Sequence, residues 1–151
     1  MTDQTIFITG GAGFIGSSLI GRLVETNRVV VYDNLTRNAL KTRPYHDHPN
    51  LTVIKGDILD AAHLTESMQG ANVVVHCAAI AGVDSVLLRP VTTMQVDMIG
   101  TANVLEAAST LDACSRVVCF STSEVFGTNA FRSSEVDDCV IGKVGEARRT
   151  Y

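Results

Sequence analysis

The sequence predicts an α/β fold in which helices cover both faces of a parallel sheet. Short runs rich in Val, Ile and Phe alternate with segments of helical periodicity, and a glycine cluster follows the first apolar run. No internal repeat or low-complexity stretch interrupts this alternation. The 151 residues, 46% of them hydrophobic, correspond to one domain, residues 1–151, with enough apolar content to build a core.

The first half of the chain provides three strands and a helix. Residues 5–8, 28–32 and 51–55 have the length and β-branched content of buried strands. Between the first two, apolar residues recur at helical spacing over 14–24. The order is therefore strand, tight turn, helix, strand, polar loop and strand.

The second half continues the alternation. Asp60 is predicted to cap a helix that Gly70 ends, and residues 73–75 form the fourth strand. A long amphipathic helix is expected from about 90 to 111, and residues 116–120 form the fifth strand. The apolar face of the long helix is expected to comprise Val91, Met94, Met98, Ala102, Leu105 and Ala108.

Periodicity disappears from residue 121 onward, where small polar residues dominate. We expect an active-site loop there, following the fifth strand. A doubly wound sheet usually has a sixth strand, and none can form before residue 151. The sheet is therefore expected to be unfinished, with its last strands absent from the 151 residues.

Charge and cysteine content restrict the class of partner. A net charge of −4 provides no basic field for nucleic acid or an anionic membrane. No signal peptide or spanning helix is predicted, so we expect a soluble, cytoplasmic protein. The four cysteines make no CxxC pair and no metal-ligand cluster, so reduced thiols, the first three buried, and no metal are expected.

The glycine cluster has the spacing of a dinucleotide-binding turn. Gly10, Gly13 and Gly16 form a G-x-x-G-x-x-G pattern between the first strand and the first helix. The first glycine permits the turn, the second lets backbone approach a pyrophosphate, and the third lets the helix pack closely. Free N–H groups and the helix dipole would then hold the phosphates. A glycine-rich turn alone is a weak signal, and its place between strand and helix strengthens it.

An acidic residue follows the second strand at the required distance. Asp33 lies 17 residues after Gly16 and could accept both hydroxyls of an adenosine ribose. Its charge would repel a 2′-phosphate, which favours NAD, although the nearby Arg37 keeps NADP open. Asp57 could accept from the adenine amine while Ile58 packs on the ring. An Asx turn is the alternative for Asp33, and a simple turn aspartate for Asp57.

Four segments together resemble the extended short-chain dehydrogenases. They are TGGAGFIG at 9–16, YDNL at 32–35, GDI at 56–58 and HCAA at 76–79. This family includes nucleotide-sugar 4-epimerases, 4,6-dehydratases and UDP-glucuronate decarboxylases, and it has a Rossmann-type fold. The resemblance implies that NAD contacts further residues in these segments and just after them, namely Phe14, Ile15, Asn34, Ala78, Ala79 and Ile80.

Two residues near this expected site need separate comment. His76 at the end of the fourth strand suits a structural role with a backbone partner. Asp97 stands where the family usually has Asn, which puts one expected amide hydrogen bond near the cofactor in doubt.

The resemblance also implies catalytic residues. Residues 121–127 are similar to the family's S-T/S-x-x-V-Y-G segment, with Phe126 in place of Tyr, so Thr122 would bond the reacting oxygen of the sugar. Tyr151 would be the general base of a Y-x-x-x-K pair, whose lysine lies beyond residue 151. A phenol needs such a cation to lower its pKa. The alternatives are a turn for Thr122 and no role for Tyr151.

The reaction that the resemblance implies begins with oxidation at C4 of the sugar, in which a hydride passes to NAD and later returns. Glu124 makes the Thr-Ser-Glu triplet more similar to the UDP-glucuronate decarboxylases than to the 4-epimerases or 4,6-dehydratases, unless it is an ordinary loop glutamate. A non-catalytic NAD(H) sensor would share the glycines and Asp33 without needing Thr122, Glu124 and Tyr151. The resemblance implies that residues 1–151 are the N-terminal part of a longer enzyme whose C-terminal substrate-binding portion is absent. The full-length protein is expected to be a homodimer through two long helices, and the 151 residues alone are expected to be inactive.

Overall fold

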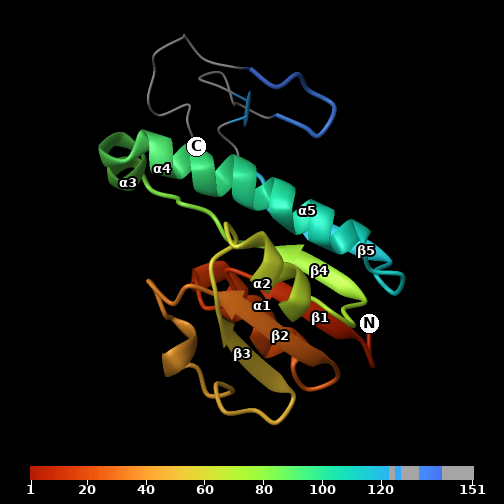
Figure 1. The fold of residues 1–151 in the computed structure, drawn as a ribbon. Coiled ribbons are helices and arrows are strands. Elements are labelled where there is room, and N and C mark those ends of the chain that lie inside the picture. Colours follow the sequence, from red (N-terminus) through yellow and green to blue (C-terminus); the bar gives the residue numbers. More distant parts are fainter. Residues whose placement is uncertain (123–124, 127–132, 141–151) are drawn as a thin grey trace.

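The structure is a computed structural model, and it describes residues 1–122, 125–126 and 133–140. Within these residues one parallel sheet has the strand order β3-β2-β1-β4-β5 (Figure 1). Its strands are β1 (Thr5–Thr9), β2 (Arg28–Asp33), β3 (Leu51–Lys55), β4 (Val73–His76) and β5 (Arg116–Cys119). The predicted parallel α/β sheet is confirmed, with strand ends that differ by one residue at most. This arrangement is of the Rossmann type.

Helices join the strands in the expected order. They are α1 (Phe14–Leu23), α2 (Ala61–Ser67), α3 (Val83–Leu88), α4 (Pro90–Met94) and α5 (Thr101–Ser109), with a 3-10 turn η1 (Leu40–Thr42) and a π-helical segment η2 (Gln95–Gly100). Asp60 caps α2 by accepting a hydrogen bond from the backbone N–H of His63 at 3.1 Å. Gly70 follows α2 with a φ of 78°. The predicted N-cap is confirmed, whereas the helix ends two residues earlier than predicted, because its C-cap is Met68.

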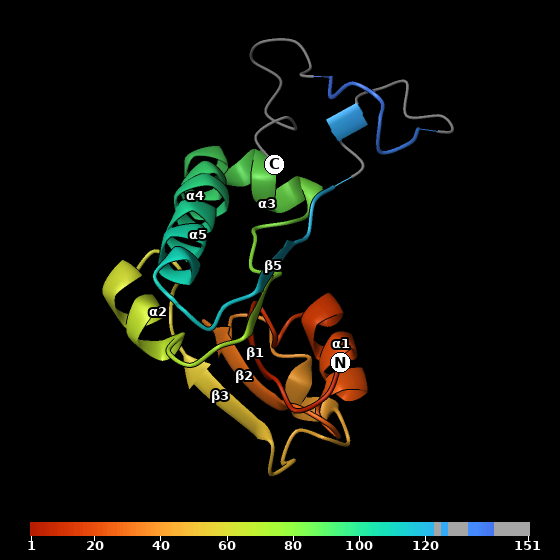
Figure 2. The same cartoon turned by 90° about the vertical axis from the view of Figure 1, so that its right-hand side faces the viewer.

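The sheet is the middle of three layers (Figure 2). Because side chains alternate along a strand, Ile6 and Ile8 pack toward α1, whereas Phe7 packs toward α2 and α5. The cluster on the α1 side also contains Val29, Val31, Val73 and Val75. The cluster on the other side contains Tyr32, Leu64, Met68, Val74 and Val104. Burial of these two apolar clusters holds the layers together.

The long helix differs from its predicted packing. Segments α4, η2 and α5 form one continuous rod (Figure 1). Most of the predicted apolar face is exposed: Val91 is 69% exposed, Met98 63% and Leu105 45%. The rod packs on the sheet through Val104, Ala107 and Ala108, and only Ala108 of these belongs to the predicted face. Two physical reasons account for this. Small side chains let the helix approach β4 closely, and η2 shifts the angular register between the two ends of the rod.

Two strands are less buried than predicted. Strands β3 and β5 lie at the edges of the sheet within the described residues, and all of their residues are exposed or half-buried. Cys119 in β5 is consequently exposed, and Cys77 and Cys114 are half-buried, so the expectation of buried thiols is wrong for Cys119. The short helix α3 had no counterpart in the sequence analysis.

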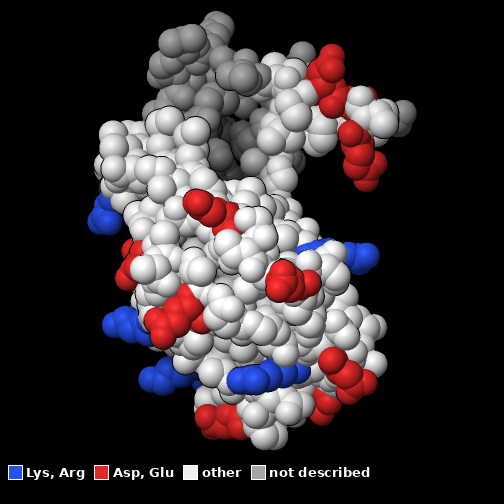
Figure 3. All heavy atoms as spheres, turned by 45° about the vertical axis from the view of Figure 1, so that its right-hand side comes forward, with Lys and Arg blue, Asp and Glu red and all other residues white. Residues whose placement is uncertain are grey.

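Positive and negative side chains are interspersed over the surface seen in Figure 3. Within the described part of the chain, no helix is both long enough and apolar enough to cross a bilayer.

Candidate functional site

A crevice is expected at the carboxyl edge of the sheet between β1 and β4, where the strand order reverses. The loops after these two strands meet through backbone atoms. Gly10 has a φ of 68°, and a Cβ built on it would lie 2.5 Å from the backbone N of Ala78. Only glycine fits this position, because a side chain would be strained by the left-handed backbone and would overlap the β4 loop.

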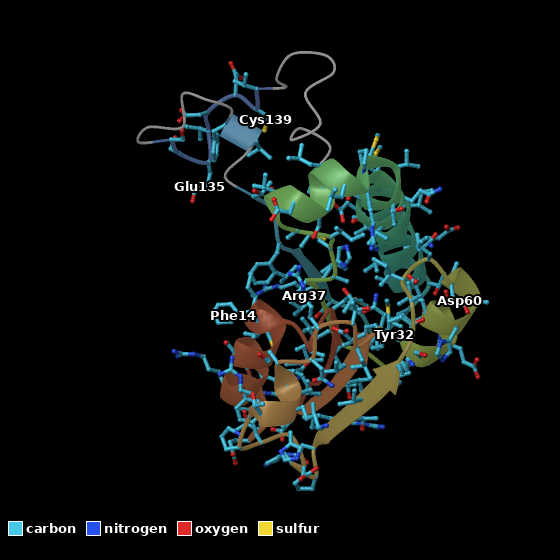
Figure 4. The ribbon with its side chains drawn as sticks, turned by 90° about the vertical axis from the view of Figure 1, so that its left-hand side faces the viewer. Phe14, Tyr32, Arg37, Asp60, Glu135 and Cys139 are labelled. Atoms are coloured by element: carbon cyan, nitrogen blue, oxygen red, sulfur yellow. The ribbon has the colours of Figure 1, made fainter. Side chains whose placement is uncertain are left out.

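Helix α1 begins at this crevice with an uncapped N-terminus. Gly13 is its N-cap and supplies no side-chain cap, and the first turn has no acidic residue. A Cβ on Gly13 would meet only the carbonyl oxygen of Gly10 at 3.2 Å, so the space outside Gly13 is open. Phe14 is 78% exposed at the outer end of α1 (Figure 4), and Ile15 follows it, half exposed. Such a helix N-terminus presents N–H groups and a positive dipole end to an anion.

The third glycine of the motif has a different task. A Cβ on Gly16 would lie 2.6 Å from the Cα of Gly11. Gly16 is therefore needed for close packing of α1 on the turn, as its position in the pattern predicts.

Asp33 ends β2 with its carboxylate directed toward the glycine turn. Its Oδ2 accepts from the N–H of Ala12 at 3.0 Å, and its Oδ1 accepts from the N–H of Leu35 at 2.7 Å. Burial raises the pKa of Asp33, and these two hydrogen bonds oppose the rise. The Asx-turn interpretation is correct for Oδ1. The bond to Ala12 also ties the carboxylate to the turn, and each oxygen keeps acceptor capacity for a further donor.

The loop after β2 carries two more residues of interest. Asn34 is exposed, and its Oδ1 accepts from the backbone N–H of Thr36 at 3.0 Å. Arg37 is exposed in the same loop (Figure 4).

The segment after β3 is shaped by hydrogen bonds and core packing. Asp57 is exposed, and its Oδ1 accepts from the N–H of Leu59 at 2.9 Å, as in an Asx turn. Ile58 is 5% exposed and packs against Gly100, where a Cβ would lie 2.3 Å from Cδ1 of Ile58. Ile58 is thus almost entirely packed in the core, and only a small part of its surface is accessible for contact with an adenine ring.

His76 ends β4 and is 6% exposed. Its Nδ1 lies 2.6 Å from the hydroxyl oxygen of Thr9, and its Nε2 lies 2.9 Å from the hydroxyl oxygen of Thr101. Burial lowers the pKa of His76, which favours the neutral ring. The sequence analysis assigned His76 a backbone partner, whereas both ring partners are hydroxyl groups.

The loop that follows β4 is held by Asp97 from η2. The Oδ1 of Asp97 accepts from the N–H of Ile80 at 2.9 Å. Its Oδ2 is buried and has no hydrogen-bond partner within the described residues. Burial raises the pKa of Asp97, and the bond from Ile80 opposes the rise. Asp97, which stands where the family usually has Asn, therefore still supplies a hydrogen-bond acceptor to the loop after β4. Ala78 and Ile80 are half-buried, and Ala79 is exposed.

Of the three predicted catalytic residues, only Thr122 belongs to the described part of the chain. It is half-buried and follows β5, where the N–H of Phe120 donates to the carbonyl of His76 at 3.1 Å. This bond keeps the start of the predicted catalytic segment beside the end of β4. Glu124 and Tyr151 lie outside the described residues. Among the described side chains, no three His, Cys, Asp or Glu gather as metal ligands would.

Comparisons with known proteins point to one family of enzymes. The family model for GDP-mannose 4,6 dehydratase matches residues 7–137. The chain is 37% identical over 147 residues to a UDP-N-acetyl-alpha-D-glucosaminuronate decarboxylase from Bacillus cytotoxicus, with 95% of this chain and 44% of that protein covered. The chain therefore spans less than half the length of this relative.

Solved structures show the same fold. A UDP-N-acetylglucosamine 4-epimerase from Methanobrevibacter ruminantium, in complex with UDP-N-acetylmuramic acid, superposes with a TM-score of 0.86 and 28% identity over 99% of this chain and 48% of that one. The enzyme WbmH from Bordetella bronchiseptica, in complex with NAD+, has a TM-score of 0.70 and 32% identity over 83% of this chain and 42% of that one.

Proposed function

The chain belongs to the family that the GDP-mannose 4,6 dehydratase model describes, within the extended short-chain dehydrogenases, and on this premise we propose that its protein is an NAD-dependent enzyme that modifies a nucleotide sugar. One observation carries the proposal. The uncapped start of α1 and the Asp33 carboxylate face the same glycine turn, as a dinucleotide requires.

The residues of the crevice fit NAD. In the proposed complex the first-turn N–H groups of α1, at Phe14 and Ile15, hold the diphosphate above Gly13. Asp33 accepts the adenosine ribose hydroxyls, and its negative charge disfavours a 2′-phosphate. The NAD+ complex of WbmH supports this choice of cofactor. Further proposed contacts are those of Gly10, Gly16, Asn34, Asp57, Ile58, Ala78, Ala79 and Ile80.

Catalysis is proposed to use the segment after β5. The hydroxyl of Thr122 donates a hydrogen bond to the oxygen on C4 of the sugar, and Tyr151 removes the proton from that oxygen. NAD held in the crevice would supply the acceptor for the C4 hydride and the donor for its return. Glu124 acts at the sugar ring after C4 becomes a ketone. For a substrate with a carboxylate on C5, the C4 ketone stands β to that carboxylate. The bond between C5 and the carboxylate carbon can then break, CO2 leaves, and the electron pair of the bond remains on the sugar as the enolate of the ketone.

We propose a UDP-sugar decarboxylase as the leading activity, because Thr-Ser-Glu occupies residues 122–124 and the Bacillus cytotoxicus relative is a decarboxylase. A nucleotide-sugar 4-epimerase is the second candidate, favoured by the Methanobrevibacter structure. A 4,6-dehydratase, the activity that names the family model, comes third.

These activities are separated by one set of incubations. The full-length protein is supplied with UDP-glucuronate, UDP-N-acetylglucosaminuronate, UDP-glucose or dTDP-glucose, and CO2, 4-keto sugar and epimer are measured. We expect CO2 from a uronate and a strong loss of rate in Glu124→Gln. Epimer without CO2 would favour the second candidate. Absence of turnover with every nucleotide sugar, together with retained NAD binding, would favour the non-catalytic sensor.

A homodimer is part of the proposal. The exposed apolar side chains Val91, Met94, Met98 and Leu105 lie along the rod of α4, η2 and α5, and an exposed stripe of this kind is typical of a helix that packs against another subunit. Sedimentation of the full-length protein tests it: the expected dimer should dissociate when Met98 is replaced by Glu. A wild-type monomer would contradict it.

A further inference from the structure

A line of hydrogen bonds connects both ends of the loop after β4. It begins at the N–H of Ala78, which donates to the hydroxyl oxygen of Thr9 at 3.5 Å, and it continues through the two ring nitrogens of His76 to the hydroxyl of Thr101. That hydroxyl donates to the carbonyl oxygen of Asp97 at 2.5 Å. The carboxylate of Asp97 in turn accepts from the N–H of Ile80.

The chemistry of the groups fixes the direction of the bond to Thr101 and, when the ring of His76 is neutral, the direction of the bond to Thr9. A carbonyl oxygen can only accept, so the single hydroxyl hydrogen of Thr101 is used on Asp97, and the oxygen of Thr101 must accept from Nε2–H of His76. In a neutral imidazole Nδ1 is then an acceptor. It receives the hydroxyl hydrogen of Thr9, whose oxygen remains available to the N–H of Ala78.

From this geometry we infer that neutral His76, protonated on Nε2, is a positioning residue that holds the loop 78–80 in the conformation that binds NAD. The inference rests on the proposed function and goes beyond it, because His76 itself contacts no ligand in this assignment. Three secondary-structure elements contribute: Thr9 ends β1, His76 ends β4 and Thr101 begins α5. The line of bonds therefore also fixes how β1, β4 and the long rod meet at the crevice.

The surroundings of His76 suit a neutral ring. Strand β1 has no ionisable side chain, and the register partner on β5 is the thiol Cys119. Cys77 follows His76, and burial raises the pKa of its thiol to about 11, so it is neutral as well. From η2, Asp97 directs its carboxylate oxygen Oδ1 to the N–H of Ile80, and the Asp97 group that meets Thr101, the partner of His76, is the neutral backbone carbonyl. Protonation of Nδ1 would leave the hydroxyl hydrogen of Thr9 without its acceptor.

The test combines NAD affinity with a direct view of the imidazole. In the full-length protein, Thr9→Val and Thr101→Val each remove one hydroxyl with little change of shape, and Thr9→Ser and Thr101→Ser are the matched controls that keep it. Dissociation constants for NAD are measured by calorimetry at a temperature where circular dichroism shows every variant folded. Nitrogen-15 NMR of the wild type identifies which ring nitrogen of His76 is protonated.

We expect each valine variant to bind NAD about tenfold more weakly and each serine variant within about twofold of the wild type. The NMR spectrum should show a proton on Nε2 and none on Nδ1. Valine variants that stay folded and bind NAD as the wild type does would overturn the inference, as would a proton on Nδ1. A wild type that binds no NAD would instead overturn the proposed function, and the positioning role with it. The NMR result separates the two failures, because it needs no cofactor.

Discussion

Replacing Gly10 by Ala should destabilise the protein much more than the same change at Gly13 or Gly70. Two costs add at this position. The φ of 68° places the new side chain in the left-handed region, which costs about 1 kcal/mol. The new Cβ would lie 2.5 Å from the backbone N of Ala78, where no flexible side chain can yield, and overpacking of this kind costs about 1–3 kcal/mol. We expect a total loss of about 2–4 kcal/mol.

Two control variants separate these costs. Gly70→Ala has a similar φ of 78° but meets nothing within 4 Å, so it should lose only about 1 kcal/mol. Gly13→Ala has an ordinary φ of −73° and a nearest contact of 3.2 Å, so its stability should stay within about 1 kcal/mol of the wild type. Its Cβ would nevertheless stand where the diphosphate is proposed to lie, so NAD binding should weaken by about tenfold or more.

The assay is urea unfolding of the three variants without cofactor, followed by NAD titration of those that remain folded. Equal losses for Gly10→Ala and Gly70→Ala would refute the backbone contact between the glycine turn and the β4 loop. Normal NAD affinity in Gly13→Ala would refute the proposed place of the diphosphate.

Further predictions concern single side chains. Asp33→Asn should weaken NAD binding by about tenfold and narrow the preference for NAD over NADP, measured by calorimetry with both cofactors, and unchanged affinity would contradict the ribose assignment. Asp60→Ala should lower the free energy of unfolding, measured with urea, by about 1 kcal/mol, because α2 loses its N-terminal cap. A loss below a few tenths of a kcal/mol would contradict this role of Asp60. Burial lowers the pKa of His76 in the folded protein below the ordinary value of 6.5, so between these two pKa values the unfolded chain binds more protons than the folded one. The free energy of unfolding should therefore fall as the pH drops through that window and then level off. A flat profile in the wild type, or the same slope in a His76→Gln variant, would disprove this. Iodoacetamide at pH 8 should modify the exposed Cys119 well before Cys77, whose pKa is about 11, as peptide mass spectrometry can follow, and the reverse order would contradict the burial of Cys77.

Local pattern was sufficient for most of the fold. The strand runs, the cap at Asp60 and the left-handed Gly70 each depend on a few neighbouring residues, and all were predicted. The failures concern packing partners. The stripe containing Val91 and Met98 has the spacing of a core face, but apolar periodicity says only that a face avoids water and leaves open which surface covers it. The sheet is covered by Val104 and Ala107 of α5, while Leu105 of the same helix stays exposed.

The candidate site divides in the same way. The cofactor contacts of Gly10, Gly13, Gly16 and Asp33 stay predictions. The turn at Gly10, the close packing at Gly16 and the place of the Asp33 carboxylate were predicted, because each depends on backbone conformation or charge at a fixed distance along the chain. The partners of His76 were not, since Thr9 lies 67 residues away and Thr101 25 residues away, and threonines in a strand and a helix carry no distinguishing signal.

The sequence by itself determined the alternation of strands and helices, the glycine turn and the acid at the end of β2, because these depend on short-range conformational preference and on the order of elements. Only the tertiary structure decided which face of the long rod is buried, that Asp97 holds the N–H of Ile80, and which nitrogen of His76 carries the proton. Those features depend on atoms that folding brings together from distant parts of the chain, and hydrogen bonding and close packing act only at such short range.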